Sequence, residues 1–189
     1  MKTLLKLAAI SLLVATATQA LAADKIKIGT EGAYPPFNSM TADGKVVGFD
    51  VDIANALCAQ MKAECEIVTQ DWDGIIPGLI AKKYDAIIAS MSITDERKQQ
   101  VDFTNPYYKS ALTFVAKAGS GVTEVTADTL KGKTVGAQAG TTQADFVAAA
   151  FPDVELKSYP TQDEVSLDLV NGRLDFGVSD LFPMMDWIA

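Results

Sequence analysis

The sequence predicts an α/β protein made of two consecutive units. Short apolar segments of strand character alternate with segments whose apolar residues recur at helical spacing, first over 26–89 and again over 112–178. Such alternation is typical of sheets with parallel strands and right-handed crossovers. The pattern breaks near 107–112. We therefore expect two lobes, 23–109 and 110–189, joined by one crossover.

The first 22 residues have the organisation of a secretory signal peptide. Lys2 and Lys6 precede an apolar run at 7–15, and Ala20-Leu21-Ala22 forms an A-x-A cleavage site. The apolar run is too short to span a bilayer. Cleavage after Ala22 predicts an exported, periplasmic chain without a membrane anchor. It leaves 14 basic against 24 acidic residues, so the net charge changes from −8 to −10.

Composition excludes several classes of function. The chain of 189 residues has no histidine, so it cannot form a Ser-His-Asp or Cys-His catalytic site. Histidine is also the commonest zinc ligand, and we expect no metal and no cofactor. An acidic chain without a cluster of lysine and arginine is a poor partner for nucleic acid. We expect a monomer.

The first unit reads as strand, helix, strand, helix and strand. The pattern predicts strands at 26–30, 65–69 and 84–89, with a helix at 73–82 between the last two. Asp50 is expected to cap the remaining helix. The apolar face of that helix is predicted to contain Ala54, Leu57, Cys58 and Met61.

The second unit repeats the alternation after a polar, glycine-containing loop at 118–126. Helices are predicted at 141–151 and from Thr161 to about 171, the latter opened by the capping box Thr161-Gln162-Asp163-Glu164. The four predicted strands are 112–116, 133–137, 154–158 and 174–178.

Cys58 and Cys65 are the two cysteines of the chain. In an exported protein, two cysteines this close suggest a disulfide between the end of a helix and the next strand. The alternative is a pair of buried free thiols.

Polar residues follow the predicted strand 84–89, where ligands of open α/β sheets bind. Ser90, Ser92 and Arg97 lie in this segment, and Thr94 can cap a short helix. The planar guanidinium of Arg97 matches a carboxylate. The alternative is a local pair between Arg97 and Asp95 or Glu96 on the solvated face.

Two further groups of residues could complete a binding site. The glycine-containing turn at 136–143 ends a strand and opens a helix, which makes it a candidate anion site. Asp180 follows the last predicted strand and could face the same crevice. Glu31, Tyr34 and Trp72 follow other strands, and aromatic rings there can stack on a cationic side chain.

The motifs of the chain, in their order and spacing, resemble those of the polar-amino-acid substrate-binding proteins of bacterial ABC importers. The lysine/arginine/ornithine-binding and opine-binding members are the most similar in motif, and the resemblance covers the whole mature chain. The motifs are Ile28-Gly29-Thr30-Glu31, Tyr34-Pro35-Pro36-Phe37, Gly48-Phe49-Asp50-Val51-Asp52, Ser92-Ile93-Thr94-Asp95-Glu96-Arg97, Asp102-Phe103-Thr104, Gly140-Thr141-Thr142-Gln143 and Gly172-Arg173-Leu174-Asp175.

This resemblance implies a type II periplasmic-binding-protein fold, in which two lobes close on an amino acid that is then delivered to an ABC permease. Arg97 would hold the ligand carboxylate and Asp180 its ammonium group. Glu31 would favour a basic side chain, stacked between Tyr34 and Trp72. The other implied contacts are Ser90, Met91, Ser92, Thr141, Thr142 and Gln143. Cys58 and Cys65 match a disulfide of the basic-amino-acid subgroup.

The chain departs from the family pattern at three points. Ala89 replaces a common serine, and Gln138 occupies a position that is usually apolar. The chain also stops at Ala189, before the segment by which family members return to the first lobe, so we expect a C-terminally truncated fold. Two other functions remain open: a periplasmic dehydratase, with Glu31 as its general acid, and the ligand-binding domain of a sensor.

Overall fold

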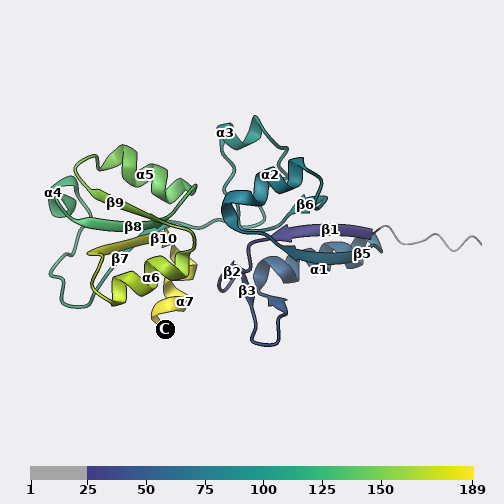
Figure 1. The fold of residues 1–189 in the computed structure, drawn as a ribbon, viewed down its shortest axis with the longest axis horizontal. Coiled ribbons are helices and arrows are strands. Elements are labelled where there is room, and N and C mark those ends of the chain that lie inside the picture. Colours follow the sequence, from purple (N-terminus) through teal and green to yellow (C-terminus); the bar gives the residue numbers. More distant parts are fainter. Residues whose placement is uncertain (1–24) are drawn as a thin grey trace, which may run out of the picture.

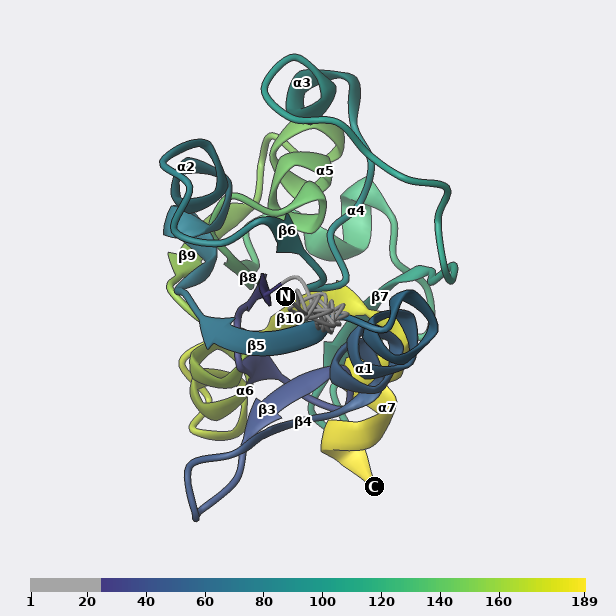
Figure 2. The same cartoon turned by 90° about the vertical axis from the view of Figure 1, so that its right-hand side faces the viewer.

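The computed structural model describes residues 25–189, so the predicted signal peptide lies outside the described residues. Figure 1 shows two sheets at opposite ends of the molecule, each packed with helices. In the view along the long axis, the N-terminal elements lie in front of the C-terminal sheet (Figure 2).

The first sheet, here called the N-terminal sheet, has the strand order β5-β1-β6 and is parallel throughout. Its strands are β1 (Lys25–Thr30), β5 (Glu64–Thr69) and β6 (Ala86–Ile87). The crossovers contain α1 (Phe49–Met61), the 3₁₀ turn η1 (Trp72–Gly74) and α2 (Ile75–Ile80). The predicted β-α-β-α-β order is confirmed. Strand β6 is shorter than predicted.

Apolar residues pack on both faces of the N-terminal sheet. Ile28, Ala54 and Cys58 form the cluster under α1, and Ile75, Tyr84 and Ala89 form the cluster beside α2. The predicted apolar face of α1 is only half right, because Leu57 and Met61 are exposed on the described chain. Cys58 and Cys65 form the expected disulfide, with Cα atoms 6.1 Å apart.

A small antiparallel sheet fills the connection between β1 and α1. It consists of β2 (Ala33–Tyr34), β3 (Asn38–Met40) and β4 (Val46–Val47). The expected cap from Asp50 is wrong: the N-cap of α1 is Gly48, and no side chain within residues 25–189 caps this helix. Asp50 lies one residue inside the helix and is fully buried, where three other side chains supply its hydrogen bonds.

The second sheet, here called the C-terminal sheet, has the order β7-β10-β8-β9. Strands β8, β9 and β10 are parallel, and β7 is antiparallel to β10. The bounds are β7 (Leu112–Ala116), β8 (Thr134–Gln138), β9 (Glu155–Tyr159) and β10 (Phe176–Asp180). All four strands were predicted, although β10 begins and ends two residues later than expected.

Helices cover both faces of the C-terminal sheet (Figure 1). They are α4 (Ala127–Leu130), α5 (Thr142–Ala150) and α6 (Gln162–Val170). The capping box of α6 is present as predicted, and Thr141 caps α5. Gly136 and Gly177 let α6 approach closely, because a Cβ at either position would meet the side chain of Val165.

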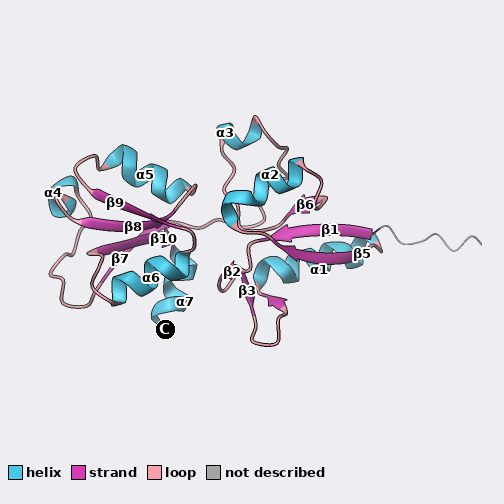
Figure 3. Ribbon diagram, viewed as in Figure 1, coloured by secondary structure: helices cyan, strands magenta, loops and turns pink. Residues whose placement is uncertain are grey.

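One loop joins the two halves after α3 (Asp95–Lys98), and it crosses at 99–111 (Figure 3). Thr94 caps α3 as predicted, because its hydroxyl accepts from the Arg97 amide at 3.1 Å. The chain ends in α7 (Leu181–Ile188), which sequence reasoning missed. Phe182 of this helix packs edge-on against Phe37, with ring centroids 6.3 Å apart. Within residues 25–189, no helix is long and apolar enough to cross a membrane.

Candidate ligand-binding site

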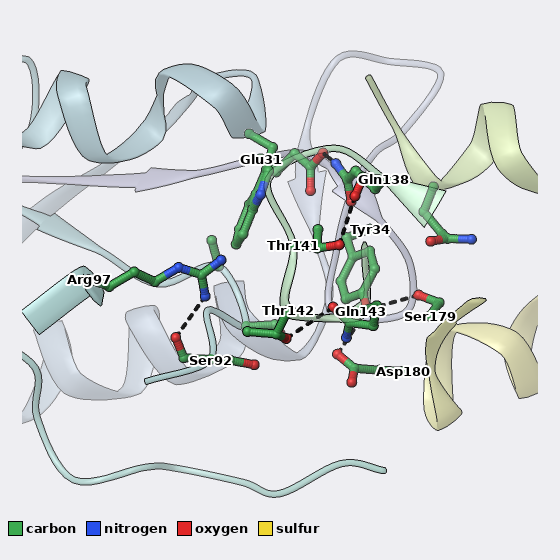
Figure 4. Close-up of a pocket in the computed structure, with 14 residues that line it drawn as sticks. Glu31, Tyr34, Ser92, Arg97, Gln138, Thr141, Thr142, Gln143, Ser179 and Asp180 are labelled. Atoms are coloured by element: carbon green, nitrogen blue, oxygen red, sulfur yellow. Dashed lines mark hydrogen bonds between the residues drawn. The ribbon is translucent and has the colours of Figure 1, made fainter. Parts of the chain in front are cut away.

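The strands of both sheets end at one cavity between the halves. Glu31 follows β1, Ser90 follows β6, Gln138 ends β8 and Asp180 ends β10. The carboxyl ends of parallel strands are where open α/β sheets bind ligands. Figure 4 shows the cavity with its side chains.

The cavity has a volume of about 30 Å³, which is room for two or three water molecules. Side chains from the two halves meet across it. Its lining comprises Glu31, Tyr34, Trp72, Ala89, Ser90, Ser92, Arg97, Gln138, Thr141, Thr142, Gln143, Gln162, Ser179 and Asp180. This is less room than an amino acid needs, so a bound ligand would have to displace contacts made across the cavity.

Glu31 and Gln138 form one contact between the halves. The Nε2 atom of Gln138 donates to Oε1 of Glu31 at 2.5 Å and to the Pro160 carbonyl at 3.0 Å. Burial raises the pKa of the Glu31 carboxyl to about 7, against a smaller lowering effect from the Gln138 hydrogen bond. Within residues 25–189 no cationic side chain pairs with this carboxylate, so its charged form is costly.

Tyr34 and Asp180 form a second contact. The Tyr34 hydroxyl donates to Oδ2 of Asp180 at 3.0 Å and lies 3.2 Å from the Ser179 hydroxyl. Burial raises the pKa of the Asp180 carboxyl, and hydrogen bonds from Tyr34 and Gln143 lower it in part. Asp180 is thus a half-buried carboxylate that a cationic group would stabilise.

Arg97 and Trp72 reach the turn at Gly140 from the other half. Arg97 donates to the Ser92 carbonyl at 2.7 Å and to the Gly140 carbonyl at 3.0 Å, and the Trp72 indole donates to the same Gly140 oxygen at 3.1 Å. The guanidinium carbon lies 5.4 Å from the centre of the Trp72 ring. Burial lowers the pKa of Arg97, while Asp145 and Glu96 oppose that shift. Among residues 25–189, Arg97 forms no ion pair with Asp95 or Glu96, which was the alternative, and Asp95 pairs with Lys98 instead.

The first turn of α5 forms one wall of the cavity. The Thr141 hydroxyl donates to the Gln138 carbonyl at 2.7 Å and accepts from the Ala144 amide at 3.2 Å. The Thr142 hydroxyl lies 3.2 Å from Oε1 of Gln143. The positive end of the helix dipole therefore faces the cavity beside Arg97, which suits an anionic group.

Ten of the eleven residues expected to contact ligand line this cavity. Met91 does not, and it packs against the cluster of Ile75, Tyr84 and Ala89. Gln162 and Ser179 line the cavity but were not foreseen. Both could have been suspected from their neighbours in the sequence, because Gln162 follows the helix cap Thr161 and Ser179 precedes the expected ligand contact Asp180. The Nε2 atom of Gln162 is buried and has no hydrogen-bond partner among the described residues.

The sequence matches the family described as bacterial extracellular solute-binding proteins, family 3, over residues 26–180. The chain belongs to this family. The L-arginine-binding protein of Pseudomonas aeruginosa is 49% identical to this family member over 168 residues, which are 87% of this chain and 64% of that protein. The lysine/arginine/ornithine-binding periplasmic protein of Escherichia coli is 42% identical over 178 residues, covering 91% and 68% of the two chains.

A solved structure of an ancestral arginine-binding protein bound to arginine shares the fold. It superposes with a TM-score of 0.83 at 37% identity, over 88% of this chain and 74% of that one. The type II fold expected for this family member is thereby confirmed. The chain spans about two thirds of the length of the curated relatives it matches.

Proposed function

We propose that this chain is an extracytoplasmic binding protein that captures a basic amino acid and delivers it to an ABC permease. Arginine, lysine, ornithine and the related opines are the candidate ligands. In this proposal residues 1–22 direct export to the periplasm, and residues 23–109 and 110–189 form two lobes that bind the ligand between them. The chain acts as a monomer.

The charge of the cavity carries the proposal. Its lining contains two carboxylates, Glu31 and Asp180, and one guanidinium, Arg97. A basic amino acid has the complementary set: two cationic groups and one carboxylate. Burial raises the pKa of both carboxyls, so a bound cation would relieve a desolvation cost at each.

In this proposal each ligand group has a partner in the cavity. The ligand carboxylate would lie between Arg97 and the first turn of α5 and replace the Gly140 carbonyl on the guanidinium. The ammonium group would bind Asp180, and the basic side chain would extend past Tyr34 and Trp72 toward Glu31. Lysine, arginine and ornithine differ in the length of the side chain that would extend toward Glu31.

The proposed ligand contacts would also favour closure of the two halves. Both halves contribute charged partners, so a ligand that bridges them binds the closed arrangement better than an open one. The direct contacts of Glu31 with Gln138, and of Arg97 with Gly140, join the halves in the described structure. A ligand must exchange these contacts for its own, and the loop at 99–111 is the connection about which the halves would move.

A dehydratase would need a proton donor in the cavity, and Glu31, with a pKa raised to about 7, is the candidate. The curated relatives described above are binding proteins, which favours saturable binding without turnover for this chain. We expect no consumption of prephenate or arogenate. Loss of either compound on incubation with the chain, abolished in Glu31→Gln, would establish the enzymatic alternative.

Isothermal titration calorimetry and thermal unfolding test the proposed function together. We expect L-arginine, L-lysine or L-ornithine to bind with one site per chain and to raise the unfolding temperature, because a ligand specific for the native state stabilises it. L-glutamine and L-glutamate are the uncharged and acidic controls. Equal stabilisation by all five amino acids, or by none, would refute selectivity for basic ligands.

A further inference from the structure

Asp50 is a buried carboxylate that no part of the proposed site uses. Its side chain accepts hydrogen bonds from Nδ2 of Asn38 at 2.7 Å, from the Ser90 hydroxyl at 2.9 and 3.0 Å, and from the Tyr107 hydroxyl at 2.7 Å. The residue is 0% exposed. No salt bridge within residues 25–189 includes it. Burying a carboxylate costs free energy when only neutral hydrogen-bond donors surround it. The presence of Asp50 at this position therefore needs a specific reason.

The three donors come from separate parts of the chain. Asn38 lies on β3, Ser90 in the loop after β6 and Tyr107 in the connection between the halves, while Asp50 itself lies on α1. The other end of the Asn38 amide accepts from the Gly32 amide at 2.7 Å, next to Glu31. One carboxylate thus fixes the loops that border the cavity.

The network uses both hydrogen-bond donors of Ser90. Its hydroxyl donates to Asp50, and its backbone amide donates to the Tyr107 hydroxyl at 2.9 Å. Ser90 also has a φ of 54°, a left-handed conformation that is uncommon for residues other than glycine. Because Ser90 lines the cavity, it can present only oxygen lone pairs to a ligand.

We propose that Asp50 is a positioning residue that orients the Ser90 hydroxyl as an acceptor and thereby selects ligands with an ammonium group beside Asp180. The ligand part of this inference rests on the proposed function. An asparagine at position 50 would offer an amide N–H to Ser90. The serine hydroxyl could then turn its hydrogen toward the cavity, where it would oppose an ammonium group.

The test compares L-arginine with 5-guanidinopentanoic acid, which lacks only the α-amino group. Asp50→Asn should weaken L-arginine binding by about tenfold, as expected for the loss of one hydrogen bond to a charged group. It should change binding of the deamino analogue by less than about twofold, since that ligand has no ammonium to lose. Asp52→Asn, an exposed change of the same charge in the same helical turn, should leave both affinities unchanged.

A double-mutant cycle separates positioning from a general loss of structure. In a Ser90→Ala background, Asp50→Asn should have no further effect on L-arginine affinity, because the group through which it acts is gone. Additive losses, or equal losses for the two ligands, would overturn the inference. Thermal unfolding of each variant establishes that it is folded.

A ligand-free measurement keeps the inference independent of the proposed function. Amide hydrogen exchange at Ser90 should be faster in Asp50→Asn than in Asp52→Asn, since Tyr107 loses the carboxylate that holds it against the Ser90 amide. Equal protection in the two variants would overturn the positioning role. Absence of any amino-acid binding by the unmutated chain would instead refute the proposed function.

Discussion

The Oε1 atom of Glu31 accepts a hydrogen bond from Nε2 of Gln138 at 2.5 Å; Glu31 directly follows β1 of the N-terminal sheet, and Gln138 ends β8 of the C-terminal sheet. Both side chains are buried. The contact therefore joins the halves of the molecule at the place where the basic end of a ligand would lie. A cationic ligand group would compete with Gln138 for the same carboxylate.

The raised pKa of Glu31 predicts a change of stability with pH. Burial raises this pKa from 4.5 to about 7, so the folded state holds the proton more tightly than the unfolded state. The resulting stabilisation is present below about pH 4.5 and is lost as the pH rises through about 7. Relative to the unmutated chain, Glu31→Gln should gain at most about 3 kcal/mol of unfolding free energy between pH 4.5 and 8. Urea unfolding of both chains across this range measures the difference. Parallel pH profiles would show that Glu31 titrates normally.

Replacement of Arg97 should weaken binding while preserving the fold. Lysine keeps the charge but cannot donate to two oxygens in a fixed plane, as the guanidinium does toward Ser92 and Gly140. We expect Arg97→Lys to lower L-arginine affinity by about 100-fold in calorimetry, consistent with about 3 kcal/mol for hydrogen bonds to a charged group. The matched control is Arg173→Lys, since Arg173 pairs with Asp168 on the surface. Equal L-arginine affinities of the Arg97→Lys and Arg173→Lys variants would show that Arg97 does not bind the ligand.

The disulfide should stabilise the chain without affecting the ligand. Cys58 and Cys65 close a loop with a sequence separation of 7. Chain entropy then predicts a loss of about 2–3 kcal/mol in the double variant Cys58→Ser, Cys65→Ser. The bond joins the end of α1 to the start of β5, whereas the site lies at the opposite ends of the strands, so the affinity measured by calorimetry should stay within about twofold. A large loss of affinity in the folded double variant would contradict this separation.

Gly48 should tolerate no side chain. Its φ of 125° belongs to a region open almost only to glycine, and a Cβ there would lie 2.7 Å from the Pro36 carbonyl oxygen. Gly48→Ala should cost about 3 kcal/mol or more of unfolding free energy. Gly44 also has positive φ, at 80°, but a Cβ there would meet nothing within 4 Å, so Gly44→Ala should cost only about 1 kcal/mol. Similar urea midpoints for the two variants would show that the backbone around Gly48 can move to accommodate a Cβ atom.

Local signals in the sequence were sufficient for most of the fold. Hydrophobic alternation predicted the strands of the N-terminal and C-terminal sheets, and the capping residues Thr94 and Thr161 marked helix starts that the structure shows. These signals are local because a cap or a strand face depends on residues within a few positions. The prediction failed where distant partners decide: Leu57 and Met61 of α1 are exposed, and Asp50 bonds to distant side chains instead of capping its helix.

By itself the sequence determined the α/β class, the family motifs and the residue types that could meet a charged ligand. Only the tertiary structure decided which of them share a cavity. Met91 lies next to Ser90 and Ser92 in the sequence, yet it is absent from the cavity and packs against the cluster of Ile75, Tyr84 and Ala89, because neighbouring residues of an extended segment point in different directions. Gln138 reaches Glu31 across 107 positions because the carboxyl ends of two sheets face one another, and no local pattern encodes that distance.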